Sequence, residues 1–168
     1  MIFKLAGMIF IIMTTALGGI SFSKSLSERV KRLELIVLML DRMSTYIEFR
    51  ALHTGEILSE LSSDKSFEQL KFLTLAAEFY KSGESFHDAW MNAVENDASL
   101  KNEERAQLLA VGNSLGRSNT KGQLSMISIH SCNIKHICRT ASVESQNKGK
   151  LYRTLGILTG VFISVMLI

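Results

Sequence analysis

Two uncharged apolar stretches near the ends of the chain restrict its possible folds more than any other feature of the sequence. The first, residues 5–22, has eighteen residues without a charge, and as a helix it extends over roughly 27 Å, close to the hydrocarbon thickness of a bilayer. The second, residues 155–168, extends over roughly 21 Å and can recruit Leu151. We therefore predict a transmembrane helix in residues 1–23, a central domain in residues 24–150 and a second transmembrane helix in residues 151–168.

Basic and aromatic residues beside these stretches predict the orientation of the chain. Positive side chains flank the central domain at both ends, and this bias places residues 24–150 in the cytoplasm. The predicted membrane-interface residues are Lys24, Arg29, Lys31, Arg32, Tyr152 and Arg153. Contact with lipid phosphates is the default expectation for the basic ones, at about 1 kcal/mol per residue.

A cleaved signal peptide is the alternative interpretation of the first stretch. Lys4 can serve as a minimal basic region, and Ala16-Leu17-Gly18 offers a small-x-small cleavage site. The mature chain would then be a secreted or membrane-anchored helical binding protein. The positive flanks disfavour this alternative, because they retain the central domain on the inner side.

The sequence between the two stretches predicts an all-α fold. The chain contains no proline, which permits long helices. Apolar residues recur at helical spacing along residues 26–47, and shorter helices are expected around residues 57–61, 67–81, 86–94 and 100–115. Gly83 and Gly116 are placed to end two of them, and Ser118 or Asn119 to cap a last long helix. We predict an antiparallel bundle of about five to six helices.

Candidate catalytic and metal-binding residues are few. His130, Cys132, His136 and Cys138 are possible zinc ligands, but on one helix only Cys132 and His136 share a face. We therefore expect no metal and no cofactor, and a metalloenzyme using His130 and His136 is a minor hypothesis. No nucleotide-binding or nucleophile motif is present, and the mild charge of +3 does not favour nucleic acid. We expect a protein that is not an enzyme.

Other conspicuous residues are expected to have structural roles. The sequence 103–105, Glu-Glu-Arg, is interpreted as a solvated helix face. Trp90, the only tryptophan, is expected in the core, and the spacing of Gly112 and Gly116 is typical of a tight packing contact followed by a helix end.

Several of these residues belong to a recognisable pattern. The stretch Gly112-Asn113-Ser114-Leu115-Gly116-Arg117-Ser118-Asn119-x3-Gln123 resembles the G-x-x-L-G-x-S/H-D-x3-Q signature of the stage III sporulation protein AB family of endospore-forming bacteria. The pair Ala89-Trp90 and the segment Leu151-Tyr152-Arg153-Thr154-Leu155-Gly156-x3-Gly160 are also similar to that family, and the resemblance extends over the whole chain. The family-motif residues are Trp90, Gly112, Leu115, Gly116, Asn119 and Gln123.

Two positions depart from the family pattern. The family has Thr-Pro-Leu where this chain has Leu52-His53-Thr54, so the proline of the first connection is absent. Asn119 stands where aspartate is common and keeps the capping ability.

The resemblance implies a component of the assembly that links mother cell and forespore during sporulation, located in the mother-cell membrane around the forespore. The soluble part of the family is similar to the cytoplasmic domain of the inner-membrane platform protein of type II secretion systems. By that analogy the chain couples a cytoplasmic secretion-type ATPase to membrane subunits of a channel, and it can form a homo-oligomer. Composition and spacing indicate only a membrane-tethered helical bundle.

Overall fold

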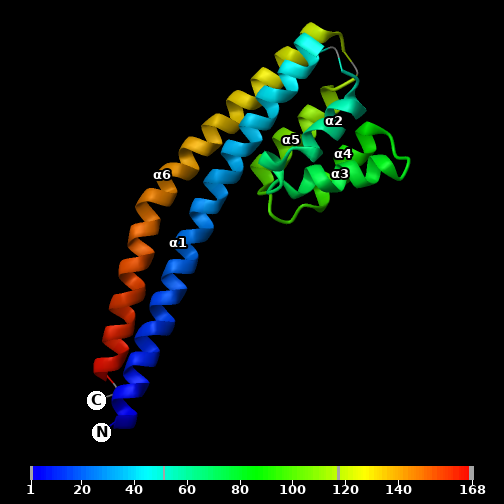
Figure 1. Cartoon of the computed structure of the whole chain (residues 1–168). Coiled ribbons are helices and arrows are strands. Elements are labelled where there is room, and N and C mark those ends of the chain that lie inside the picture. The colour runs from blue at the N-terminus through cyan, green and yellow to red at the C-terminus, as the bar shows by residue number, and fades with distance from the viewer. Residues whose placement is uncertain (1, 51, 117, 167–168) are drawn as a thin grey trace. The chain divides into compact units, whose positions relative to one another are not determined.

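The chain is all-helical, as predicted. The computed structural model describes residues 2–50, 52–116 and 118–166, and these contain six α-helices and no strand (Figure 1). The helices are α1 (Ile2–Thr45), α2 (Thr54–Ser63), α3 (Lys71–Lys81), α4 (Phe86–Asn96), α5 (Asn102–Ser114) and α6 (Thr120–Met166), with a π-helical turn η1 (Tyr46–Arg50) and a 3-10 turn η2 (Lys65–Phe67).

The helices form two compact units, and α1 and α6 contribute to both. Residues 32–138 make up the helical core unit, which contains η1, α2, η2 and α3–α5 together with parts of α1 and α6. Met1–Lys31 and Arg139–Ile168 make up the two-helix unit. The predicted boundaries at residues 23 and 151 refer to a membrane and stay a prediction.

The core unit is organised around the stripe predicted on the first long helix. Its members Leu33, Ile36, Leu40 and Met43 are fully buried, and Ile47 in η1 extends the stripe. The shorter helices each contribute an apolar face, and α6 closes the core; the buried side chains of these elements include Ile57, Leu58, Leu61, Phe72, Leu73, Ala76, Trp90, Val94, Leu108, Val111, Ile127 and Ile134. Asp41 of α1 lies beside Ser131, whose hydroxyl donates to it at 3.3 Å, and beside Lys135 at 3.7 Å.

Two glycines end helices as predicted, because each adopts a positive φ. Gly83 has φ +104°, and the amides of Gly83 and Glu84 donate to Tyr80 and Phe79, which is a Schellman motif. Gly116, with φ +72°, follows α5. The starts of two elements differ from the expectation: Phe67 lies in η2 rather than in α3, and Leu100 precedes α5 by two residues.

In the two-helix unit, α1 and α6 run antiparallel. Phe22 stacks against Tyr152 with 5.3 Å between ring centroids, and the hydroxyls of Ser27 and Ser145 lie 3.4 Å apart. Further along, Gly156 meets the backbone of α1: a Cβ there would lie 2.7 Å from the carbonyl oxygen of Thr15 and 3.5 Å from the Cα of Gly19. Both helices continue without a break through these contacts.

The predicted membrane spans are not confirmed. Among the residues that the structure describes, no helix holds a stretch that is both long and apolar enough to qualify as a bilayer span. Part of each predicted span lies outside this description: the side chains of residues 2–6, 8, 9, 11, 12, 153, 157, 164 and 165, and residues 1, 167 and 168 entirely. The two transmembrane helices therefore stay a prediction.

Candidate functional site

The family-motif residues of α4 and α5 form a tight packing contact in the core unit. Trp90 is fully buried, and its indole Nε1 donates to the carbonyl of Leu108 at 2.8 Å. A Cβ at Gly112 would lie only 2.3 Å from Cδ1 of Trp90. Because no real Cβ tolerates such a distance, only glycine lets α5 approach the indole ring. The ring of Phe72 meets the indole edge-on, with 5.5 Å between centroids.

The remaining motif residues close the turn from α5 to α6. Leu115 is buried, and its amide donates to Val111 at 3.1 Å. Gln123 spans the turn, because its Oε1 accepts from the amide of Gly116 at 3.4 Å and its Nε2 donates to the carbonyl of Ser118 at 2.8 Å.

Asn119 caps α6. Its Oδ1 accepts the amide of Gly122 at 2.9 Å, which confirms the predicted cap with asparagine rather than Ser118. The motif thus fixes the path of the chain at this turn, except for Arg117, which lies outside the described residues.

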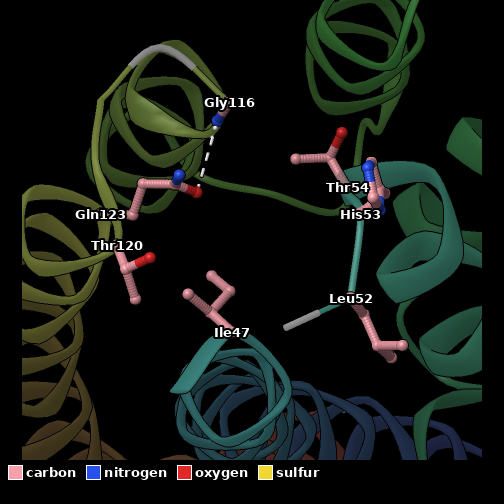
Figure 2. A pocket seen from close by; sticks show the side chains of 7 residues that line it. All are labelled: Ile47, Leu52, His53, Thr54, Gly116, Thr120 and Gln123. Carbon is pink, nitrogen blue, oxygen red and sulfur yellow. Dashed lines mark hydrogen bonds between the residues drawn. The ribbon is translucent and has the colours of Figure 1, made fainter. Parts of the chain in front are cut away.

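A pocket of about 380 Å³ lies beside this turn. Figure 2 shows Gly116, Thr120 and Gln123 along one side, Leu52, His53 and Thr54 along the other, and Ile47 from η1 between them. The pocket therefore joins two motif residues to the first connection, where the family proline is absent. In this chain the connection leads directly into α2, and the carboxylate of Glu56 accepts the amide of His53 at 2.9 Å.

Most of the predicted membrane-interface residues lie in the two-helix unit. Lys24 and Lys31 are exposed, and Lys24 lies 3.8 Å from Glu28. Arg29 is largely buried and pairs with Glu144 at 3.7 Å. Tyr152 packs on Phe22 as described above.

The last two predicted membrane-interface residues cannot be grouped with the others. Arg32 belongs to the core unit, where it is half-buried, and the side chain of Arg153 lies outside the described residues. The predicted interface role of these residues is not tested by this geometry.

The four possible zinc ligands all lie on α6. Burial lowers the pKa of His130, whose Nδ1 lies 2.8 Å from the side-chain oxygen of Gln107. Burial, and secondarily the charge of Glu34, raises the pKa of Cys138. Within the described residues, no three His, Cys, Asp or Glu side chains are arranged to hold a metal ion.

The expectation of a solvated face at residues 103–105 holds for Glu103, which is exposed, and is wrong for Glu104 and Arg105. Glu104 is fully buried, and its carboxylate accepts the amide of Lys101 at 3.2 Å. Arg105 donates from Nε to Val94 at 3.3 Å, and from Nη2 to Asp97 at 3.0 Å and Leu100 at 3.3 Å. This one guanidinium therefore ties the last turn of α4 and the α4–α5 connection to the start of α5. Three consecutive charged residues on a helix have the same sequence pattern whether their side chains are solvated or contact a neighbouring loop. The sequence therefore could not predict the contacts of Arg105 with backbone carbonyls.

A second pair of charged residues was also not anticipated. Arg42 of α1 forms an ion pair with Asp64 at the end of α2 and stacks over the ring of Phe67, 5.3 Å from its centroid.

Comparison with known families gives one match. The model of the family described as stage III sporulation protein AB matches residues 4–168, which is nearly the whole chain. No curated protein and no solved structure shows a significant match.

Proposed function

The chain belongs to the stage III sporulation protein AB family, which suggests a role in sporulation, and we propose that it acts there as a non-enzymatic membrane platform. In this proposal the two-helix unit anchors the chain in the mother-cell membrane around the forespore. The core unit lies in the cytoplasm and binds a secretion-type ATPase and neighbouring channel subunits.

The exposed apolar surface of the two-helix unit carries the proposal. On α1 the described side chains of Phe10, Met13, Leu17, Ile20 and Phe22 are exposed, and on α6 those of Leu151, Leu155, Leu158, Val161, Phe162, Ile163 and Met166. Phe162 is 69 % and Met166 81 % exposed. Leaving such surface in water costs roughly 25 cal/mol per Å², and hydrocarbon chains of a bilayer remove that cost. No charged residue occurs within residues 5–22 or 155–168.

The close contact between the two helices supports retention of the first stretch over its cleavage. Gly156 packs against Thr15 and Gly19. Cleavage after Gly18 would remove most of α1 that faces this part of α6. A mass measurement of the mature chain distinguishes the two: the proposal predicts an intact N-terminal stretch, and loss of about eighteen residues favours the secreted binding protein.

The charge of the segment from α2 to the end of the turn after α5 supports a basic partner surface. Residues 54–116 contain eleven Asp and Glu and five Lys and Arg, a net charge of −6, although the whole chain is at +3. Glu60, Glu68, Glu78 and Glu95 are among the exposed carboxylates. We infer that the ATPase meets this acidic part of the chain, because complementary charge guides association and selects partners.

A topology reporter and alkaline extraction test the proposed membrane anchoring and orientation. A reporter inserted in the exposed Gly83 turn should be active only on the cytoplasmic side, and the chain should stay in the membrane fraction after alkaline extraction. Release of the chain by alkaline extraction would reject the anchoring. Removal of the core unit by protease added to intact cells would reject the cytoplasmic orientation.

The proposed binding of an ATPase is tested separately, with the full chain in detergent. Affinity capture from sporulating cells should recover a secretion-type ATPase at low salt and less of it at high salt. The double variant Glu78→Lys, Glu95→Lys should weaken recovery, whereas the charge-neutral control Ser59→Ala, Ser63→Ala should not. Normal spore yield from a clean deletion strain would refute the role in sporulation.

A further inference from the structure

The two flanks of the two-helix unit differ in charge. Its helices meet at Ser23 and Gly149, because a Cβ at Gly149 would lie 3.1 Å from Oγ of Ser23. On one side of this contact Glu144 of α6 pairs with Arg29 of α1 at 3.7 Å and with Lys148 of its own helix at 2.7 Å. These three residues define the paired flank, where two cations share one carboxylate.

Helical geometry places Lys150 and Arg139 on the opposite side of α6. Each residue turns a helix by about 100°, so Lys150, which follows Gly149, and Lys148, which precedes it, diverge from the contact in opposite directions. Arg139 and Lys150 are eleven residues apart, about three turns, and therefore share a face. Both are exposed.

Lys24 and Lys31 occupy the corresponding side of α1. Lys24 follows Ser23 by about 100° and Arg29 follows it by about 240°, so these two side chains also diverge. Lys31 lies seven residues after Lys24, close to two turns, and shares its face. Because the pair of Arg29 and Glu144 brings one side of each helix together, the opposite sides also coincide. The basic flank is thus formed by four exposed cations, Lys24, Lys31, Arg139 and Lys150.

Little negative charge lies beside the basic flank. The only Asp or Glu of α6 is Glu144, on the paired flank, and the only one in residues 2–31 is Glu28. Glu28 lies 3.8 Å from Lys24, but both side chains are more than half exposed, so water weakens their attraction. No ion pair between described residues includes the other three cations of the basic flank. Its positive charge is therefore available to a partner.

The basic flank begins beside the apolar surface that is proposed to enter the membrane. Phe22 and Tyr152 stack against each other, and Lys24 and Lys150 each stand two residues from this aromatic pair, on the side away from the uncharged stretches. In the proposed anchoring these lysines therefore lie at the level of the lipid phosphates. The other two cations of the basic flank lie roughly 10 to 16 Å further along the helices, and a tilt toward this flank brings them closer to the same level.

Anionic lipid headgroups carry the charge that complements this flank. They are concentrated in the cytoplasmic leaflet, and each basic residue near them strengthens the attraction. We propose that the basic flank binds the phosphates of anionic phospholipids, which therefore gather on this side of the helix pair and not beside the paired flank. The inference rests on the proposed anchoring and extends it, because it assigns the lipid class and adds Arg139 and Lys150 to the interface.

Quenching of a tryptophan probe by brominated lipids tests the proposal in the full chain. One probe, Ile20→Trp, lies four residues from Lys24 on the same face, and a second, Leu151→Trp, lies three residues from Lys148; both positions are about half exposed. Each probe is made together with Trp90→Phe and reconstituted in bilayers of equal phosphatidylcholine and phosphatidylglycerol, with one of the two lipids brominated.

The basic flank should select the anionic lipid. Quenching at Ile20→Trp should show about five-fold stronger association of phosphatidylglycerol than of phosphatidylcholine, and high salt should reduce this factor. Leu151→Trp should show little preference, because Glu144 offsets the cations on its side. Equal preference at the two probes, or equal quenching by the two lipids, overturns the proposal but leaves the anchoring in place. Absence of quenching at both probes overturns the anchoring and the inference together.

Removal of the cations provides the matched comparison. Lys24→Gln with Lys150→Gln should abolish the preference at Ile20→Trp. Lys71→Gln with Lys81→Gln removes the same charge from exposed positions of α3 and should leave the preference unchanged. Retained helical circular dichroism shows that each variant is folded. A preference that survives the loss of both lysines of the basic flank, or that falls equally in the control, overturns the proposal.

Discussion

The core unit and the two-helix unit are built from the same two long helices, yet they treat apolar side chains in opposite ways. In the core unit Leu33, Ile36, Leu40 and Met43 of α1 are turned inward and fully buried. In the two-helix unit the described apolar residues of the same helix, such as Leu17 and Phe22, are exposed, and the contacts with α6 are made by small and polar residues together with the ring of Phe22. Helices that pack in water place large apolar residues between them, whereas helices that pack in lipid place small ones there. This difference between the two units is the one that the proposed anchoring of the two-helix unit in a membrane predicts.

The largest effect is expected from Trp90→Ala in the core unit. Loss of the ring and its hydrogen bond should destabilise this unit by about 4 kcal/mol. Amide hydrogen exchange of the full chain in micelles should then speed up in α3, α4 and α5 and stay unchanged in residues 13–30 of α1. Trp90→Phe serves as the milder control. Equal acceleration in both regions would break the comparison, because it would mean that the two units unfold as one.

A charge placed on the other region should affect membrane attachment instead of folding. Leu158→Lys puts an ammonium group on the exposed apolar surface of α6, and a charge near the middle of a bilayer costs about 3 kcal/mol. The fraction of chain that resists alkaline extraction should fall, while urea unfolding of the core unit followed by Trp90 emission stays the same. Gln69→Lys, at an exposed position of the core unit, is the matched control. If both lysines act alike, the apolar surface is not a lipid contact.

Arg105→Ala sharpens the comparison within the core unit. It removes the guanidinium donors to one carbonyl in the last turn of α4 and to two in the α4–α5 connection, and should cost about 2 kcal/mol. Arg105→Lys should recover only part of this, because an ammonium group lacks the planar fork of donors. Urea unfolding monitored by Trp90 emission measures both variants. Lys71→Ala on α3, an exposed cation, is the control, and a similar loss there would mean that any removed charge destabilises the unit.

The cap of α6 has a smaller expected effect. Asn119→Ala removes the acceptor of the Gly122 amide and should cost about 1 kcal/mol, measured by the same urea titration. Asn119→Asp restores the residue common in the family and should keep or slightly improve stability, because a carboxylate also complements the helix N-terminus. A stabilising Asn119→Ala would contradict the capping role.

The smallest effect is expected from pH. Burial lowers the pKa of His130 in the folded chain, so below its ordinary value near 6.5 the unfolded chain binds more protons than the folded one. Stability should therefore decrease as the pH falls through that range. His130→Asn should flatten this dependence. Urea midpoints at pH 7 and pH 5 provide the measurement, and an unchanged slope in the variant would assign the titration elsewhere.

The sequence alone predicts the helices well and the site only in part. Apolar spacing located the long helices. Gly83 and Gly116 located the ends of α3 and α5, and Asn119 located the start of α6, because these signals are local. Three features could not be found in this way. The π-helical turn that contains Phe49 adds one residue, and the spacing of apolar residues does not reveal this insertion. The pocket joins residues more than sixty positions apart, which no local pattern can predict. Arg105 looks solvated in sequence, since its acceptors are backbone carbonyls that carry no residue signature.

The contact of Gly156 with Thr15 and Gly19 has a mechanical consequence. Where two backbones meet without an intervening side chain, the two helices are in direct contact and resist separation at that level. A longitudinal load on α1 at this level is consequently shared by α6. We expect the two helices to bend or tilt together. A larger residue at Gly156 would separate them and let each helix move independently.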